Sequence, residues 1–268
     1  MQLIDSHSHL DFNEFDNDRA AAIKRAKDAG ISNIIVSATT AERWSCIKAL
    51  CQKQGTEQPQ CHPAYGMHPM FLSEHKNQHL YELKQWLETE NPIAIGEIGL
   101  DYFIDEANGE NSPQIRKSQL DLFIAQLELA DEFDLPVIIH ARKSLDIVLK
   151  QLRLFPKIIG SIHSFSGSEQ QALQLIDLGF FLGFGGSITY TRATKLRKLV
   201  ATLPLEFLLL ETDSPDQPDS SHYNERNEPA YLISVAQVIA ELRNISVEEV
   251  VHATTENAET LFNFNLSP

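Results

Sequence analysis

Two histidines near the start of the chain, His7 and His9, are separated by one residue and follow a short apolar run. Side chains two positions apart in an extended strand leave the same face, so both imidazoles are expected to point the same way. Neutral imidazoles bind divalent metals, and a pair at a strand end supplies half of a metal site. An isolated pair of this kind is also a frequent coincidence, so the other ligands must come from elsewhere.

Four further side chains that can bind metals follow other apolar runs of the sequence. They are Glu97, His140, His163 and Asp213, each at the carboxyl end of a run typical of a β-strand. Any one of them alone could be a hydrogen-bonded core residue. Together with the first pair, they make four histidines and two carboxylates, a set that would hold one or two divalent cations.

Short apolar runs alternate with longer amphipathic stretches along the whole chain. The expected strands are residues 3–5, 33–37, 62–66, 94–98, 137–140, 158–163, 181–184 and 207–210. The expected helices are residues 16–29, 41–54, 80–90, 113–133, 143–154, 168–178, 192–203, 229–242 and 246–262. About eight such alternations favour an α/β fold of the TIM-type (β/α)8 barrel class over a doubly wound open sheet. In such a barrel, the metal site would lie at the C-terminal face of the strands, where the polar segments 101–112 and 214–227 are expected as active-site loops.

Length and composition narrow the class of protein further. The 268 residues, 43% of them hydrophobic, predict a single barrel domain over residues 1–268. Because the sequence has neither an apolar stretch of about 18 residues nor a secretory signal, and its three cysteines are sparse, we expect a cytoplasmic protein without membrane contact. The net charge of −15 argues against a protein that coats nucleic acid through Lys and Arg. No obligate protein partner is evident, and the amphipathic helices are compatible with a monomer.

Six segments of the sequence resemble the motif set of the TatD family of metal-dependent deoxyribonucleases, which belongs to the amidohydrolase-like barrels. They are His7-Ser8-His9, Gly96-Glu97-Ile98-Gly99-Leu100-Asp101, His140-Ala141-Arg142, His163-Ser164-Phe165-Ser166-Gly167, Leu210-Glu211-Thr212-Asp213-Ser214-Pro215 and Arg226-Asn227-Glu228-Pro229. The segments occur in order over nearly the whole chain. The resemblance implies a TIM-type barrel, two divalent metal ions, and hydrolysis of DNA phosphodiester bonds, including exonuclease activity. Histidine and carboxylate ligands accommodate Mg, Mn, Zn or Ni, so the metal is not identified.

The resemblance also implies a role for each candidate ligand. Glu97 would bridge the two metals. One metal would lie with His7 and His9, and the other with His140 and His163. Asp213 would be a metal ligand that also acts on the nucleophilic water, which makes Asp213 and Glu97 the catalytic candidates. Closure of a barrel independently places the eighth strand beside the first, which brings Asp213 close to His7 and His9.

Three further side chains are candidates for contacts with the substrate. Arg142, two residues after His140 and on the same face, could hold a phosphate through two parallel hydrogen bonds or form a surface ion pair. Arg226 could contact phosphate or fix the loop before the last helices. His68 follows the third strand and is expected to line the pocket. Glu211, one pleat deeper in its strand, could hydrogen-bond a metal-binding histidine.

Two other functions are compatible with the same residues. The first is an amidohydrolase-type, metal-dependent hydrolase of a small ester, lactone or amide, since a fold does not settle the substrate. Against it, Glu97 occupies the bridging position in place of a lysine suited to carboxylation. The second is a metal-binding regulatory or scaffold protein without turnover, which would have to lack a water-activating group, whereas Asp213 is present.

Overall fold

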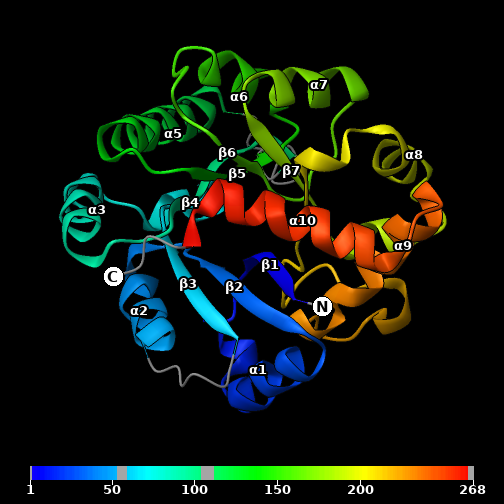
Figure 1. The fold of residues 1–268 in the computed structure, drawn as a ribbon. Helices are drawn as coiled ribbons and strands as arrows, with labels where there is room; N and C mark the ends of the chain where they lie inside the picture. The colour runs from blue at the N-terminus through cyan, green and yellow to red at the C-terminus, as the bar shows by residue number, and fades with distance from the viewer. Residues whose placement is uncertain (1, 53–58, 104–111, 265–268) are drawn as a thin grey trace.

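The computed structural model describes residues 2–52, 59–103 and 112–264, in which eight parallel strands form one sheet with helices outside it (Figure 1). The strands are β1 (Leu3–Ser8), β2 (Ile31–Ser37), β3 (Gln60–Tyr65), β4 (Ala94–Asp101), β5 (Val137–Arg142), β6 (Gly160–Ile162), β7 (Phe180–Phe184) and β8 (Leu208–Leu210). Each strand pairs with the next one in the sequence. An isolated parallel bridge joins Ser8 of β1 to Ser214, which lies in the segment after β8. The fold is therefore the expected TIM-type (β/α)8 barrel.

The helices surround the barrel and follow the expected order. They are α1 (Arg19–Asp28), α2 (Trp44–Gln52), α3 (Asn77–Glu90), α5 (Pro113–Phe133), α6 (Leu145–Leu152), α7 (Glu169–Asp177), α8 (Thr194–Thr202), α9 (Leu232–Arg243) and α10 (Val247–Phe262). Two expected helix starts are capping residues, because Ser168 and Ser246 each form a capping box with the residue three positions later. The polar loop expected at 101–112 lies outside the described residues over 104–111, as do residues 53–54 of the helix expected at 41–54. No helix in the described parts is long and apolar enough to cross a membrane.

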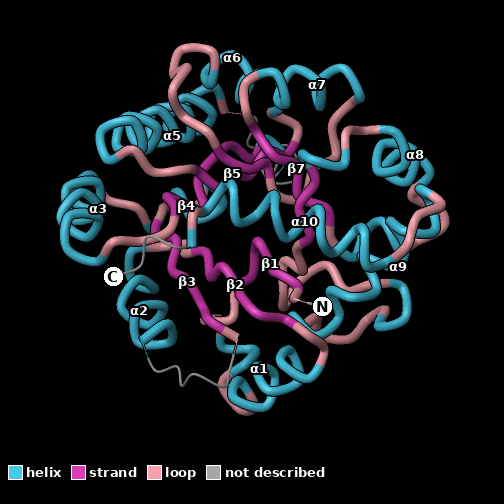
Figure 2. Tube along the Cα trace, in the orientation of Figure 1, coloured by secondary structure: helices cyan, strands magenta, loops and turns pink. Residues whose placement is uncertain are grey.

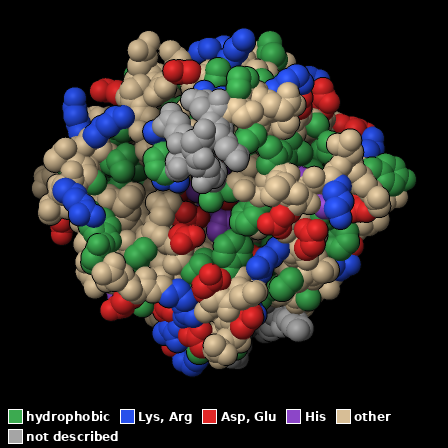
Figure 3. Space-filling view, turned by 180° about the vertical axis from the view of Figure 1, so that it is seen from behind, with side chains coloured by type: hydrophobic (Ala, Val, Ile, Leu, Met, Phe, Trp, Pro, Cys, Tyr) green, Lys and Arg blue, Asp and Glu red, His purple; other side chains and the backbone are tan. Residues whose placement is uncertain are grey.

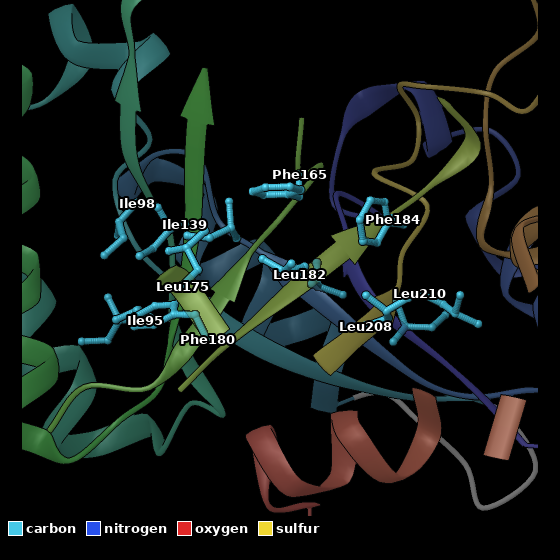
Figure 4. Packing of buried hydrophobic residues seen from close by; sticks show 14 of the residues in the cluster. Ile95, Ile98, Ile139, Phe165, Leu175, Phe180, Leu182, Phe184, Leu208 and Leu210 are labelled. Atoms are coloured by element: carbon cyan, nitrogen blue, oxygen red, sulfur yellow. The ribbon is translucent and has the colours of Figure 1, made fainter. Parts of the chain in front are cut away.

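Two apolar layers hold the barrel together. The outer layer packs the strands against the helices, and Figure 4 shows part of it, including Ile95, Ile139, Phe180 and Leu175. The inner layer consists of side chains that point into the barrel from seven strands, namely Ile4, Ile35, Ala64, Ala94, Ile138, Phe181 and Leu209. Helix α10 covers this layer with Ala258, Leu261 and Phe262, and it crosses one end of the barrel in Figure 2. Burial of each large side chain stabilises the fold by roughly 1.5–3 kcal/mol.

A register shift in β4 decides which of its side chains enter the barrel. Ala94 belongs to the inner layer, so strict alternation would turn Gly96 inward and Glu97 outward. The pairing with β5 shifts between Ile95 and Ile98, and both of these residues join the outer layer. The extra residue changes the phase of the alternation, as a β-bulge does. Glu97 therefore points into the barrel.

The first strand contains a similar irregularity. Ile4 belongs to the inner layer, so alternation along β1 would direct Ser8 into the barrel. The pairing with β2 shifts between Asp5 and Ser8. His7, within the shifted stretch, and His9, after it, face the interior, and the Ser8 hydroxyl lies 2.9 Å from the hydroxyl of Ser214 in the segment after β8. In both strands, the shift separates an apolar end from a polar end of the barrel.

Candidate metal centre

All six side chains expected to bind metals meet at the carboxyl ends of the strands. A cavity of about 610 Å³ opens there, on the face opposite α10, where histidine and acidic side chains are visible (Figure 3). Its lining includes His9, Glu97, His140, His163 and Asp213. His7 is fully buried beside them, with its ring stacked on that of His163 at 4.1 Å between centroids. The structure thus brings together residues from β1, β4 and β5 and from the segments after β6 and β8.

The carboxylate of Glu97 lies between two groups of histidines. Its Oε2 atom is 3.3 Å from the Nε2 atoms of both His7 and His9. Its Oε1 atom is 2.8 Å from Nε2 of His163 and 3.0 Å from Nδ1 of His140. One oxygen therefore faces each pair of imidazoles. This is the arrangement that a carboxylate shared by two cations requires.

The first histidine pair has the geometry of a cation site. Nδ1 of His9 donates to the carbonyl oxygen of Ser37 at 2.9 Å, which leaves a lone pair on Nε2 when the ring is neutral. The Nε2 atoms of His7 and His9 lie 3.2 Å apart, and Oδ1 of Asp213 is 3.4 and 3.5 Å from them. Lone pairs and carboxylate oxygens this close repel one another unless a cation or protons lie between them. The donor set therefore fits a divalent metal.

The second pair is oriented by a carboxylate at the end of β4. Nε2 of His140 lies 3.1 Å from Oδ2 of Asp101, so a neutral ring donates there and keeps Nδ1 as its free ligand atom. That Nδ1 is 3.0 Å from Nε2 of His163. Gly99, at φ 135°, allows the close approach of the two strands, because a Cβ at this position would collide with the carbonyl oxygen of His140. This pair can hold a second cation together with Glu97.

Electrostatics keeps the cluster charged. Burial by itself would raise the pKa of Glu97, but the surrounding imidazoles, that of His163 first, hold it well below its usual range. Burial would lower the pKa of His7, whereas the charge of Glu97 and a hydrogen bond to Asp213 raise it to about 9. Without a cation, protons on rings such as that of His7 therefore take the place of a metal, whereas burial lowers the pKa of His163 and favours its neutral form. Metal binding must release these protons.

His68 joins the cluster as a hydrogen-bond donor. Its Nδ1 accepts from the backbone N–H of Met70 at 3.0 Å, so the proton of the neutral ring is on Nε2. Nε2 is 2.9 Å from Oε1 of Glu97 and can donate to it. Burial lowers the pKa of His68 to about 4, which favours this neutral form. His68 lines the cavity, but the nitrogen that faces Glu97 carries a hydrogen and is not free to bind a metal.

The two arginines expected to contact substrate lie in different places. Arg142 lines the cavity, and its guanidinium stacks 3.7 Å from the ring centroid of Phe103. It makes no ion pair within the described residues. Arg226 does not line the cavity, and Asp18 binds its guanidinium through two hydrogen bonds of 2.6 and 2.9 Å. Of the two roles expected for Arg226, this ion pair favours fixing the loop before the last helices, and the phosphate contact stays a prediction.

Three residues of the site were not identified from the sequence. Ser37 accepts a hydrogen bond from His9, and Asp101 orients His140. Gln217, in the loop after β8, donates from Nε2 to Oδ2 of Asp213 at 2.5 Å. Ser37 and Asp101 are polar residues at strand ends, which is a signal that could have found them. Gln217 lies in the segment 214–227 that was expected as an active-site loop, but nothing in the sequence distinguishes it from the other polar residues of that segment.

Glu211 lies close to the cluster without being part of it. Its Oε1 atom accepts from the backbone N–H of Ser164 at 2.5 Å and lies 3.8 Å from Nδ1 of His163. A Cβ on Gly183 would collide with this carboxylate, so the glycine makes room for it. Burial raises the pKa of Glu211 to about 8. The expected hydrogen bond from Glu211 to a metal-binding histidine is not formed at this distance, and Nδ1 of His163 has no hydrogen-bond partner among the described residues.

Comparisons with known proteins agree with this geometry. Residues 4–263 match the family model described as TatD related DNase. The chain is 41% identical over 266 residues to the metal-dependent hydrolase YjjV of Escherichia coli K12, with 98% of each sequence covered. It is 35% identical to a metal-dependent hydrolase of Haemophilus influenzae, covering 98% of this chain and all of that protein.

The crystal structure of YjjV, described as a TatD homologue, has the same architecture. It superposes with a TM-score of 0.89 at 39% sequence identity, covering 97% of this chain and 98% of that one. A TatD family hydrolase of Entamoeba histolytica, at 23% identity, shares the fold with a TM-score of 0.84. Because the family model spans every strand that contributes to the cluster around Glu97, the chain belongs to the TatD family and is a metal-dependent hydrolase.

Proposed function

We propose that this chain hydrolyses phosphodiester bonds of DNA, as an exonuclease, with two divalent metal ions. The observation that carries the proposal is the position of Glu97, with one carboxylate oxygen facing each pair of histidines. The match to a family model described as TatD related DNase supports the choice of substrate. The guanidinium of Arg142 at the cavity, which forms no ion pair with the described residues, supports it as well, since it suits an anionic ligand.

Each residue of the cluster has a proposed role in holding the metals. His7, His9 and Asp213 would hold one ion, His140 and His163 the other, and Glu97 would be shared. Bound divalent cations make a water molecule more acidic and offset the negative charge that develops on a phosphate. Ser37 and Asp101 keep the imidazoles of His9 and His140 in the tautomers that this arrangement needs.

Asp213 is the proposed proton acceptor for the attacking water. Its side chain is 13% exposed, against 2% for Glu97, so it is the carboxylate of the cluster that water reaches from the cavity. Gln217 binds Oδ2, which leaves Oδ1 directed at the histidines of β1. The backbone of Asp213 adopts a left-handed conformation at φ 56°. Such a strained conformation persists where the surroundings hold a side chain in place for function.

The substrate would lie with its phosphate between this cluster and Arg142. The guanidinium can bind two phosphate oxygens in parallel, and Phe103 holds its plane. His68 donates its Nε2 proton to Glu97 and fixes the orientation of that carboxylate. The negative surface of the chain would not attract DNA, so binding would depend on these local cations.

Hydrolysis assays with defined metals test this proposal. Single- and double-stranded DNA, a chromogenic ester and a lactone would be incubated with the protein and Mg²⁺, Mn²⁺, Zn²⁺ or Ni²⁺, with and without a chelator. We expect metal-dependent release of nucleotides from DNA, abolished by the chelator. The Asp213→Asn variant should reduce this rate about 10²- to 10⁴-fold while retaining the circular dichroism spectrum of the parent.

The other outcomes are equally informative. Metal-dependent cleavage of the ester or lactone with intact DNA would replace the proposal by the small-substrate hydrolase. Release of internal fragments in place of mononucleotides would make the enzyme an endonuclease. Absence of turnover on every substrate, with Asp213→Asn no different from the parent, would favour a metal-binding protein without catalysis.

A further inference from the structure

A second cavity of about 590 Å³ adjoins the one that holds the metal cluster. The two cavities share Ser187, Leu196, Asp216 and Gln217 in their linings, so they form one continuous depression. The side chain of Gln217 also contacts Asp213. A ligand that has one group at the cluster and extends past Gln217 must therefore enter the second cavity.

Two tyrosines present aromatic surface in this second cavity. The hydroxyl of Tyr190 donates to the backbone carbonyl of Pro218 at 3.1 Å, which fixes its ring. Tyr223 packs edge-on against that ring at 6.3 Å between centroids. Yet Tyr223 is 61% exposed, and its hydroxyl has no hydrogen-bond partner in the described part of the chain. An exposed ring held in this way offers a face on which a flat aromatic ligand can stack.

An exposed arginine lies beside the tyrosines. The guanidinium of Arg192 is 5.1 Å from the ring centroid of Tyr190, and the residue is exposed. Within residues that the structure describes, it forms no ion pair, in contrast to Arg226 and Arg25, which bind Asp18. In a chain of net charge −15, a free guanidinium at a cavity suits one anionic group of a ligand.

The rest of the lining narrows the chemistry of that ligand. Asp216, Asn224 and Glu225 contribute oxygen acceptors. They disfavour a ligand that is anionic throughout, but they suit the amino groups at the edge of a nucleobase. A flat base with one attached phosphate matches the whole lining better than a free anion or an apolar tail does.

We infer that the second cavity is a subsite for the nucleotide next to the scissile phosphate. Tyr223 stacks on its base, and Arg192 binds the phosphate that links it to the rest of the strand. This inference rests on the proposed function, because it states where a DNA strand continues beyond the bond that is cut. It makes Tyr223 and Arg192 specificity-determining residues, which favour polynucleotides over small phosphodiesters.

Kinetics on two substrates tests the subsite. The metal-loaded parent, Tyr223→Ala, Tyr223→Phe and Arg192→Gln would be compared on a single-stranded oligonucleotide and on bis(p-nitrophenyl) phosphate, which is too short to fill both cavities. We expect Tyr223→Ala to lower kcat/KM for the oligonucleotide, relative to kcat/KM for bis(p-nitrophenyl) phosphate, by about 5- to 100-fold. The change should come mainly from a higher KM for the oligonucleotide. Tyr223→Phe should restore the ratio, because the ring is retained. Tyr81→Ala, at an equally exposed tyrosine of α3, is the matched control.

Binding gives a second readout that does not need turnover. The affinity of the metal-loaded protein for a phosphorothioate-linked oligonucleotide that resists hydrolysis would be measured by fluorescence anisotropy at several salt concentrations. Arg192→Gln should weaken binding about tenfold and reduce the slope of log Kd against log salt by about 0.7, the value for one phosphate contact on a single strand.

The outcomes separate the subsite from the function that it serves. If the parent degrades DNA, and Tyr223→Ala and Arg192→Gln bind and cleave the oligonucleotide as the control Tyr81→Ala does, the proposed subsite is wrong. The proposed nuclease activity is then unaffected. If the parent degrades no DNA, the proposed function fails. The anisotropy measurement still decides whether Tyr223 and Arg192 bind nucleotides, and equal affinities of parent and variants would overturn the inference.

Discussion

The two ends of the barrel use the same strands for opposite purposes. At the end covered by α10, the side chains inside the barrel are apolar and packed, with Ile4 and Ala94 as examples from β1 and β4. A few residues later, the same two strands direct His7 and Glu97 into a polar cluster. Apolar burial stabilises the first end, whereas burial of charged groups at the second end costs stability that only cations or protons offset. Stability and chemistry are thus concentrated in different halves of one structure.

The largest expected effect on activity comes from a substitution of Glu97, at the centre of the polar end. Glu97→Gln removes the charge that both histidine pairs face, so we expect bound metal to fall below the parent stoichiometry and hydrolase activity to fall more than about 10³-fold. Metal content by mass spectrometry and initial rates check this result. Unchanged metal content would show that the two pairs bind their cations without a shared carboxylate.

A matched change at the apolar end should lower stability and leave the hydrolase activity of the folded protein unchanged. Leu261→Ala leaves a cavity between α10 and the inner layer, and we expect it to lower the free energy of unfolding by about 2–5 kcal/mol. The rate per folded molecule should stay near that of the parent. Urea denaturation and assays at a temperature where both proteins are folded test the two halves of the prediction. Leu154→Ala, at an exposed leucine, is the control.

The tautomer of His140 gives a smaller and more specific effect. Asp101→Asn places an amide opposite Nε2 of His140, which favours the ring form with its proton on Nδ1, the atom directed at Glu97. We expect the affinity for one of the two proposed metal ions to fall about 10- to 100-fold. Isothermal titration calorimetry measures this change, with Asp177→Asn at an exposed carboxyl as the control. Equal loss at both metals would contradict a role confined to His140.

The pH dependence of stability should distinguish metal-free from metal-loaded protein. The pKa of His7 is raised to about 9 in the folded chain, so its contribution is fully present below the unfolded value near 6.5 and is lost as the pH rises to about 9. A bound cation takes the place of the protons on the ligand atoms. Because fewer protons compete with it as the pH rises from 6 to 9, the cation stabilises the fold more at the higher pH. We expect the gain in Tm on metal addition to grow by about 5 °C between pH 6 and pH 9. A gain that is constant with pH would contradict this account.

Where alternation is regular, the direction of a side chain followed from the residues themselves. In β5, Ile138 enters the inner layer and His140 follows two residues later on the same face. Local alternation does not predict the ion pair of Arg226, because its partner Asp18 is about two hundred positions away in the sequence.

The sequence by itself determined the barrel, the order of its elements and the kinds of side chain at the strand ends, because strand length, apolar alternation and ligand chemistry are local properties. Only the tertiary structure decided that His7, His9 and Glu97 point inward, since this depends on how β1 and β4 slip against β2 and β5. It also decided the orienting contacts of Ser37 and Asp101 and the union of the two cavities at Gln217. Register and contact between distant segments follow from packing of the whole sheet, which no short window of sequence contains.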